Sequence, residues 1–174
     1  MASAPQSTEG GAREGASLPQ FTAGLVLLDA VPVALFGASC LALGARLEST
    51  PFLCGAAICV ASGAAKVLWK LLVVFARRDF RILSTQLRYA MSCGFLLMIG
   101  ACALDARVRG RLVALVAGAG VPSIALACAW VVGMGLMFWF GSHFPREDVR
   151  ANWLEEATNA LAQACLLAAV LLLP

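Results

Sequence analysis

Residues 21–45 read FTAGLVLLDAVPVALFGASCLALGA, and Asp29 is the only charged residue in this run of 25. A helix of about 20 apolar residues spans the hydrocarbon core of a bilayer, so the run predicts a transmembrane helix. Four more apolar runs follow it, over residues 51–75, 87–104, 112–140 and 153–173. The pattern predicts an all-α, polytopic integral membrane protein with about five transmembrane helices in one compact bundle.

The composition favours a membrane protein over a soluble one. Of the 174 residues, 61% are hydrophobic and 13% are charged. Soluble domains are about half apolar and about a quarter charged, and a soluble chain of this length has too little interior to hide the excess. The net charge of +3 is small, and the basic residues lie in short clusters between the apolar runs. Because nucleic-acid binding requires a continuous basic surface, we expect no nucleic-acid partner.

The first 20 residues differ from the rest of the chain. Residues 1–20 are polar and rich in Gly, Ala and Ser, and no basic segment leads directly into an apolar core. This favours a disordered N-terminal tail over a cleaved signal peptide. The linkers between the apolar runs are short, so residues 21–174 are expected to form one helical transmembrane domain. The run at 112–140 is long enough to tilt, or to kink near Pro122.

The basic residues of the linkers predict which way the chain crosses the membrane. With five spans, the N-terminal tail shares one side with the linkers after the second and fourth spans. That side carries seven arginines: Arg13, Arg77, Arg78, Arg81, Arg88, Arg146 and Arg150. The opposite side carries four: Arg46, Arg107, Arg109 and Arg111. The difference favours a cytoplasmic N-terminus in the plasma (cell) membrane.

Motifs for metal, nucleotide or nucleophile chemistry are missing from the sequence. Seven cysteines are scattered through the apolar runs without a CxxC pair, which favours structural thiols over metal ligands or disulfides. The single histidine, His143, cannot anchor a histidine-rich metal site. The sequence contains no GxxxxGK[ST], HExxH, GxSxG or GxGxxG. We therefore expect no cofactor, no metal and no catalytic residue, although an unusual lipid enzyme stays open.

Ionisable side chains inside the apolar runs are the main indication of function, because charge in a lipid core is costly. Asp29 lies in the first run. Lys66 and Lys70 lie four residues apart in the second run and so share one helix face. Gly55 and Cys59 fall on the same face, and small residues at this spacing let helices approach closely. The two lysines are therefore expected to point toward other helices.

The fifth run carries a polar stripe of its own. Glu156, Asn159 and Gln163 fall within about 40° of one another on a helical wheel. At 1.5 Å rise per residue, Asp29 and Lys66 lie roughly 12 and 13 Å below the N-terminal face of the bilayer, and Asn159 and Gln163 roughly 9 and 15 Å below it. Charges of opposite sign are thus expected at similar depth.

Two interpretations of these charges carry equal weight. One is a polar cavity, open to one side, that binds an ion or a small polar solute. Its candidate residues are Asp29, Lys66, Lys70, Glu156, Asn159 and Gln163. The other is a buried ion-pair network that only fixes the register of the helices. Lys70 and Glu156 are placed nearer the surface, and Lys70 is expected to snorkel toward it.

Three functions follow from these features. The first is a transporter or channel for a small solute or ion, embedded in the lipid bilayer as a homo-oligomer because five short spans make a thin wall. The second is an intramembrane enzyme that acts on a lipid or isoprenoid. The third is an accessory subunit of a membrane complex. Transport is preferred, because the sequence contains no catalytic motif.

Overall fold

The computed structural model describes residues 23–76, 81–143 and 149–174, which form α-helices and no strand. The predicted tail, residues 1–20, lies outside the described residues. The helices are α1 (Ala23–Leu47), α2 (Thr50–Ala76), α3 (Arg81–Leu104), α4 (Ala106–Ala117), α5 (Val121–His143) and α6 (Val149–Leu171).

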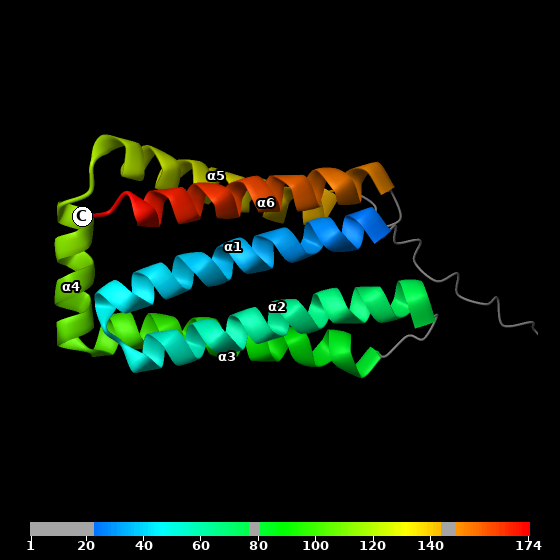
Figure 1. The fold of residues 1–174 in the computed structure, drawn as a ribbon, viewed down its shortest axis with the longest axis horizontal. Coiled ribbons are helices and arrows are strands. Elements are labelled where there is room, and N and C mark those ends of the chain that lie inside the picture. The colour runs from blue at the N-terminus through cyan, green and yellow to red at the C-terminus, as the bar shows by residue number, and fades with distance from the viewer. Residues whose placement is uncertain (1–22, 77–80, 144–148) are drawn as a thin grey trace, which may run out of the picture.

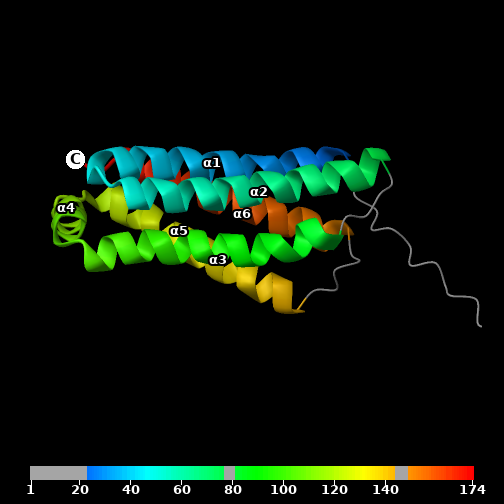
Figure 2. The same ribbon diagram turned by 90° about the horizontal axis from the view of Figure 1, so that it is seen from below.

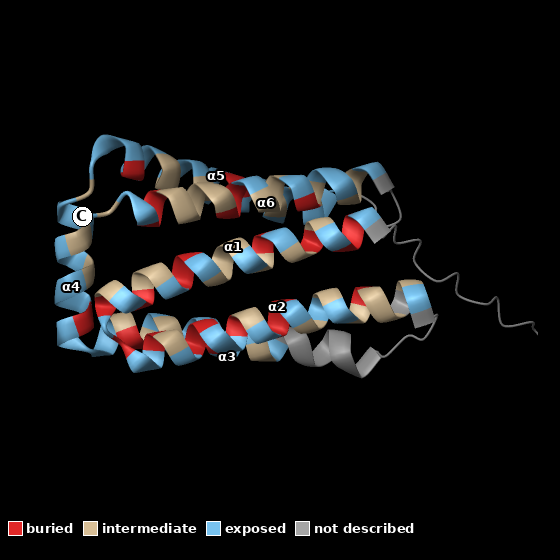
Figure 3. Cartoon of the chain, viewed as in Figure 1, coloured by how far each residue is buried: buried red, intermediate tan, exposed pale blue. Residues whose placement is uncertain are grey.

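Four of these helices, α1, α2, α5 and α6, are each long and apolar enough to cross a bilayer. Tyr89–Leu104 of α3 and the bent-off α4 meet the same criteria only when taken together, so the described residues contain four such spans, or five if this pair is counted as one. Many apolar side chains face outward, among them Leu104, Val121 and Phe138, and Figure 3 shows exposed surface along most of α5. Lipid solvates such surface where water does not. The predicted all-α, polytopic membrane fold is confirmed.

Helices α6, α1 and α2 lie side by side, with α5 behind α6 and α3 behind α2 in Figure 1, so the five long helices form a curved row (Figures 1 and 2). In this row α3 packs on α2, α2 on α1, α1 on α6, and α6 on α5. The two outermost helices, α3 and α5, make no contact with each other within the described ranges. The row is therefore open along one side, between α3 and α5.

Helix α4 lies across one end of the row (Figure 1), bent by 89° from α3. Asp105 caps its N-terminus: the carboxylate accepts the backbone N–H of Arg107 at 2.8 Å and that of Val108 at 3.4 Å. Such a cap satisfies donors that a helix start leaves unpaired, and so it stabilises the sharp turn after α3. Helix α4 ends at Ala117, followed by the C-cap Gly118.

The predicted fourth span at 112–140 is therefore wrong as a single helix. Its first residues belong to α4, and the spanning helix α5 begins only at Val121. Leu112 and Leu115 are apolar because α4 packs against the end of the bundle, where they contact a buried cluster formed around Leu47 and Phe52. Pro122 lies in the first turn of α5, where a missing N–H breaks no helical hydrogen bond. It starts a helix instead of kinking one.

Glycines allow α2 and α3 to approach closely. A Cβ added to Gly55 would lie 2.6 Å from the carbonyl oxygen of Gly94, and one added to Gly94 would lie 2.5 Å from Sγ of Cys59. Similarly, a Cβ added to Gly63 would lie 2.9 Å from a methyl group of Val33 on α1. The prediction that Gly55 and Cys59 face a neighbouring helix is confirmed.

A substitution at Gly55 tests this contact. Gly55→Ala is expected to lower the free energy of unfolding by about 1–3 kcal/mol, because the added methyl group overpacks the α2–α3 interface. This loss exceeds the gain of about 1 kcal/mol that alanine brings to a helix interior. The matched control is Gly100→Ala on α3, where a Cβ meets no described heavy atom within 4 Å. Thermal unfolding in detergent, followed by far-UV circular dichroism, should separate the two variants, and equal midpoints would contradict the close contact.

Candidate functional site

Charged side chains from three helices meet inside the bundle. The Nζ atom of Lys70 on α2 lies 2.9 Å from Oδ2 of Asp29 on α1 and 3.1 Å from Oε1 of Glu156 on α6. The three side chains are 9%, 3% and 10% exposed, respectively. Because a buried charge is tolerated only when it is paired, these contacts stabilise all three side chains where they lie. Lys70 is thus an ionic bridge between α1, α2 and α6.

Lys66 contacts the same two carboxylates more loosely. Its Nζ atom donates a hydrogen bond of 3.5 Å to Oδ1 of Asp29 and lies 4.0 Å from Oε1 of Glu156. The Lys66 side chain is 51% exposed, in contrast to the buried Lys70. We call Asp29, Lys66, Lys70 and Glu156 the charge cluster. With all four groups ionised its net charge is zero, and without Lys66 it would be negative.

Lys66 lies on the α3 side of α2. It follows Cys59 by seven residues, which places the two within about 20° of each other on a helical wheel. Cys59 in turn faces α3, since its thiol donates to the carbonyl oxygen of Met91 at 3.6 Å. The exposed half of Lys66 is therefore on the side where the row of helices is open between α3 and α5.

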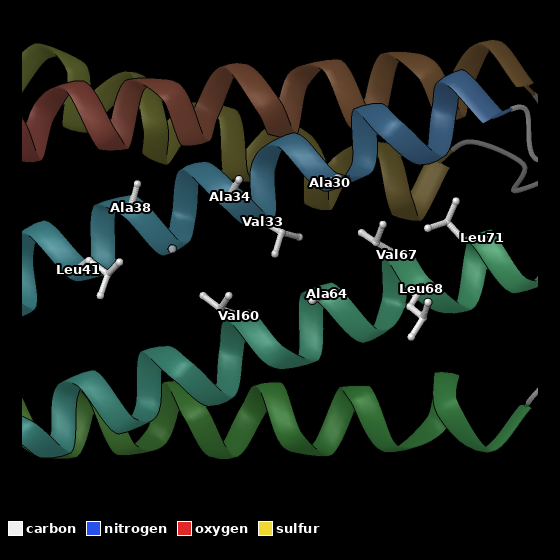
Figure 4. Close-up of a pocket in the computed structure, with 11 residues that line it drawn as sticks. Ala30, Val33, Ala34, Ala38, Leu41, Val60, Ala64, Val67, Leu68 and Leu71 are labelled. Atoms are coloured by element: carbon white, nitrogen blue, oxygen red, sulfur yellow. The ribbon is translucent and has the colours of Figure 1, made fainter.

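The opposite side of the α1–α2 pair carries an apolar groove of about 510 Å³ (Figure 4). Only Ala, Val, Leu and Gly residues line it: Ala30, Val33, Ala34, Gly37, Ala38, Leu41, Val60, Ala64, Val67, Leu68 and Leu71. None of the four charged residues contributes to this lining. The groove is suited to a hydrocarbon chain and not to an ion.

The six predicted site residues divide into two groups. Asp29, Lys66, Lys70 and Glu156 are brought together as predicted from their opposite charges. No hydrogen bond within the described ranges joins Asn159 or Gln163 to that cluster. The Gln163 side chain is buried and turned toward α5, where its Nε2 donates to the sulfur of Met134 at 3.6 Å. Met134 was not singled out from the sequence, because a methionine in an apolar run has no distinguishing pattern.

The polar stripe of α6 nevertheless leaves two hydrogen-bond acceptors unused. Oε2 of Glu156 and Oε1 of Gln163 are buried and have no hydrogen-bond partner among the described residues. A buried acceptor without a donor is unfavourable, so each of these oxygens can receive one from a bound group. Glu156 is the stronger candidate, because its oxygen carries charge and belongs to the cluster.

The relative depth of the two lysines differs from the prediction. Asp29 is six residues after the start of α1 at Ala23, Glu156 is seven after the start of α6 at Val149, and Lys70 is six before the end of α2 at Ala76. All three therefore lie about 9–10 Å from those helix ends. The predicted last span begins at residue 153, four residues after the start of α6. It therefore places Glu156 too near the surface. The prediction that Lys70 snorkels is wrong, because Lys70 is level with both carboxylates and buried between them.

No group of three or more His, Cys, Asp or Glu side chains is placed to hold a metal ion in the parts of the chain that the structure describes. No protein-family model, curated protein or solved structure matches this chain. The charge cluster is therefore the feature from which we infer function.

Proposed function

We propose that the chain is a multi-pass membrane transport protein for a small ion or polar solute, and that the charge cluster is its binding element. The observation that carries this proposal is that the two lysines differ in burial and in their distances to the carboxylates. Lys70 is buried against both carboxylates, whereas Lys66 is half exposed and contacts the same carboxylates at 3.5 and 4.0 Å. Lys66 neutralises the second carboxylate, but its loose contacts leave that carboxylate open to exchange with a bound cation.

Lys66 acts as an internal counter-ion in this mechanism. When its ammonium group moves away, Asp29 and Glu156 share only the charge of Lys70, and the cluster becomes negative. Oδ1 of Asp29 loses its donor, and Oε2 of Glu156 already lacks one among the described residues. A small cation then replaces Lys66 at these oxygens, and the return of Lys66 releases it. The transported species is therefore a cation, such as a proton or an alkali-metal ion.

Access to the cluster is from one side of the membrane. A half-exposed lysine within a span requires contact with water or with protein, because hydrocarbon cannot solvate its charge. The cluster lies near the end of the bundle at which α1 and α6 begin, and α4 crosses the opposite end (Figure 1). We place the accessible end in the cytoplasm of the cell, on the basis of the larger number of arginines in the linkers on that side.

A homo-oligomer completes the pathway. The described helices form a row that is open between α3 and α5, so one chain does not enclose a route across the bilayer. A second copy against the open side would surround the exposed half of Lys66 with protein. The small residues on the helix faces are compatible with this association.

Flux measurements test the proposal. Liposomes reconstituted with the full chain should carry H⁺, Na⁺ or K⁺ down an imposed gradient faster than protein-free liposomes, as followed with entrapped pH- and cation-sensitive dyes. Cl⁻ should not be carried, because the site that Lys66 vacates is negative. Chloride flux without cation flux would contradict the cation mechanism, and folded protein that carries none of these ions would contradict its transport.

A second candidate function is that of an accessory subunit, and it is favoured by one observation. Lys70 by itself joins three helices through its contacts with Asp29 and Glu156, without any ligand. Such a network can fix helix register. In that case the chain should co-purify with a stoichiometric partner and show no ion flux by itself.

A further inference from the structure

A second apolar groove runs along α3 and ends close to α4. It has a volume of about 360 Å³. Its lining consists of Phe52, Phe95, Met98, Ile99, Cys102 and Ala103. The α3 members recur at every turn, so they form a stripe about 12 Å long between Phe95 and Ala103. This groove is separate from the charge cluster.

An arginine of α4 is fixed at the end of this groove. Nη1 of Arg109 donates a hydrogen bond of 2.7 Å to the carbonyl oxygen of Ala103, the last groove residue along α3. Arg109 is itself exposed, so the donors of its guanidinium group that do not bind Ala103 face outward. A charged group is thus held where the apolar lining ends.

The arginines at this end of the bundle are not all neutralised. Arg111 forms an ion pair of 2.7 Å with Glu48. The side chain of Arg107 is exposed and has no ion pair or hydrogen bond to any described residue, and the carboxylate of Asp105 is engaged as the cap of α4. Arg107 and Arg109 lie about 200° apart around α4, and only Arg109 is fixed at the groove end. Its guanidinium group leaves a positive charge there that calls for an anion.

The position of α4 fits the headgroup region of a bilayer. Helix α3 packs along the membrane-spanning α2 and ends at Leu104, at the end of the bundle that α4 crosses (Figure 1). Helix α4 follows at 89° and so lies along the membrane plane. Its apolar face, with Val108, Leu112 and Leu115, is turned toward the bundle end. A basic helix in this position contacts lipid headgroups.

We infer that this end of the protein binds an anionic phospholipid. The headgroup phosphate pairs with Arg109, because a guanidinium group presents parallel donors to phosphate oxygens. One acyl chain follows the groove along α3 from Ala103 toward Phe95. The combination of charge and groove selects a lipid over a free anion, which would gain nothing from the apolar lining. This inference does not depend on the proposed transport.

The inference is tested on the full chain in detergent, with phosphatidylglycerol and phosphatidylcholine of the same acyl chains as probes. Phosphatidylglycerol should be retained in native mass spectra and should raise the midpoint of thermal unfolding, and phosphatidylcholine should do so much less. Arg109→Gln should weaken the apparent affinity for phosphatidylglycerol about fivefold. The control Arg150→Gln removes the same charge from α6 and should leave the affinity unchanged.

A second variant tests the groove with the charge intact. Ala103 is exposed, so Ala103→Leu should fold normally while it narrows the groove end, and phosphatidylglycerol should again bind more weakly. Inorganic phosphate alone should give no stabilisation. Equal retention of the two lipids, an unchanged affinity in the Arg109→Gln protein, or full stabilisation by inorganic phosphate would each overturn the lipid site.

Discussion

Lys70→Met is expected to destabilise the folded bundle by about 3–5 kcal/mol, the range found when one partner of a buried ion pair is removed. Methionine matches the length of lysine but carries no charge. Asp29 and Glu156 would then lie buried on either side of an apolar side chain, with only the loosely held Lys66 to compensate them. The loss should appear as a lower midpoint when helicity is followed in mixed micelles with increasing sodium dodecyl sulfate.

A charge-neutral variant separates the ion pair from simple packing. In the quadruple variant Asp29→Asn, Lys66→Met, Lys70→Met, Glu156→Gln, no charge is left in the cluster. Since apolar or neutral replacements of a whole buried network are often close to neutral, most of the stability should return. If Lys70→Met costs less than about 1 kcal/mol, the value for an exposed pair, then Lys70 is not the buried bridge described here.

The fold was largely predictable because apolar length is a strong signal. Four helices long and apolar enough to span the membrane follow from four of the apolar runs, and a fifth span is reached only if α3 and α4 are counted as one. The error fell on residues 112–117, which belong to α4. Leu112 and Leu115 are apolar because they pack on the end of the bundle, and hydropathy does not distinguish this environment from lipid. Asp105 and Gly118 mark the actual ends of α4, as cap residues do.

The residues of the charge cluster were predictable from the sequence, but their relative depths were not. Opposite charges in three apolar runs must find one another in lipid, which is why Asp29, Lys66, Lys70 and Glu156 meet. Which lysine is buried depends on helix ends, and those are uncertain by a few residues in a sequence. An error of four residues is a full turn, enough to exchange the depths of neighbouring side chains. A helical wheel places Gln163 on the same face of α6 as Glu156, but the Gln163 side chain turns toward Met134 of α5.

Lys66→Met is expected to abolish cation transport while leaving the protein folded. Lys66 is half exposed and lies 3.5 Å or more from both carboxylates, so its removal should lower the free energy of unfolding by less than the removal of the buried Lys70 does. Its role as the counter-ion that releases a bound cation has no substitute, because Lys70 is buried in the bridge. The matched control is Lys70→Met, which removes the same charge but should lower the free energy of unfolding more than Lys66→Met does.

The most direct test of the charge cluster as a transport element is the flux of H⁺, Na⁺ and K⁺ through liposomes that contain the Lys66→Met protein, compared with wild type at equal reconstitution. Unfolding of both proteins in detergent is measured alongside, so that a loss of flux can be assigned to the missing ammonium group. We predict flux at the level of protein-free liposomes from a Lys66→Met protein that is folded and more stable than the Lys70→Met protein. Wild-type flux in the Lys66→Met protein would contradict the role assigned to the cluster.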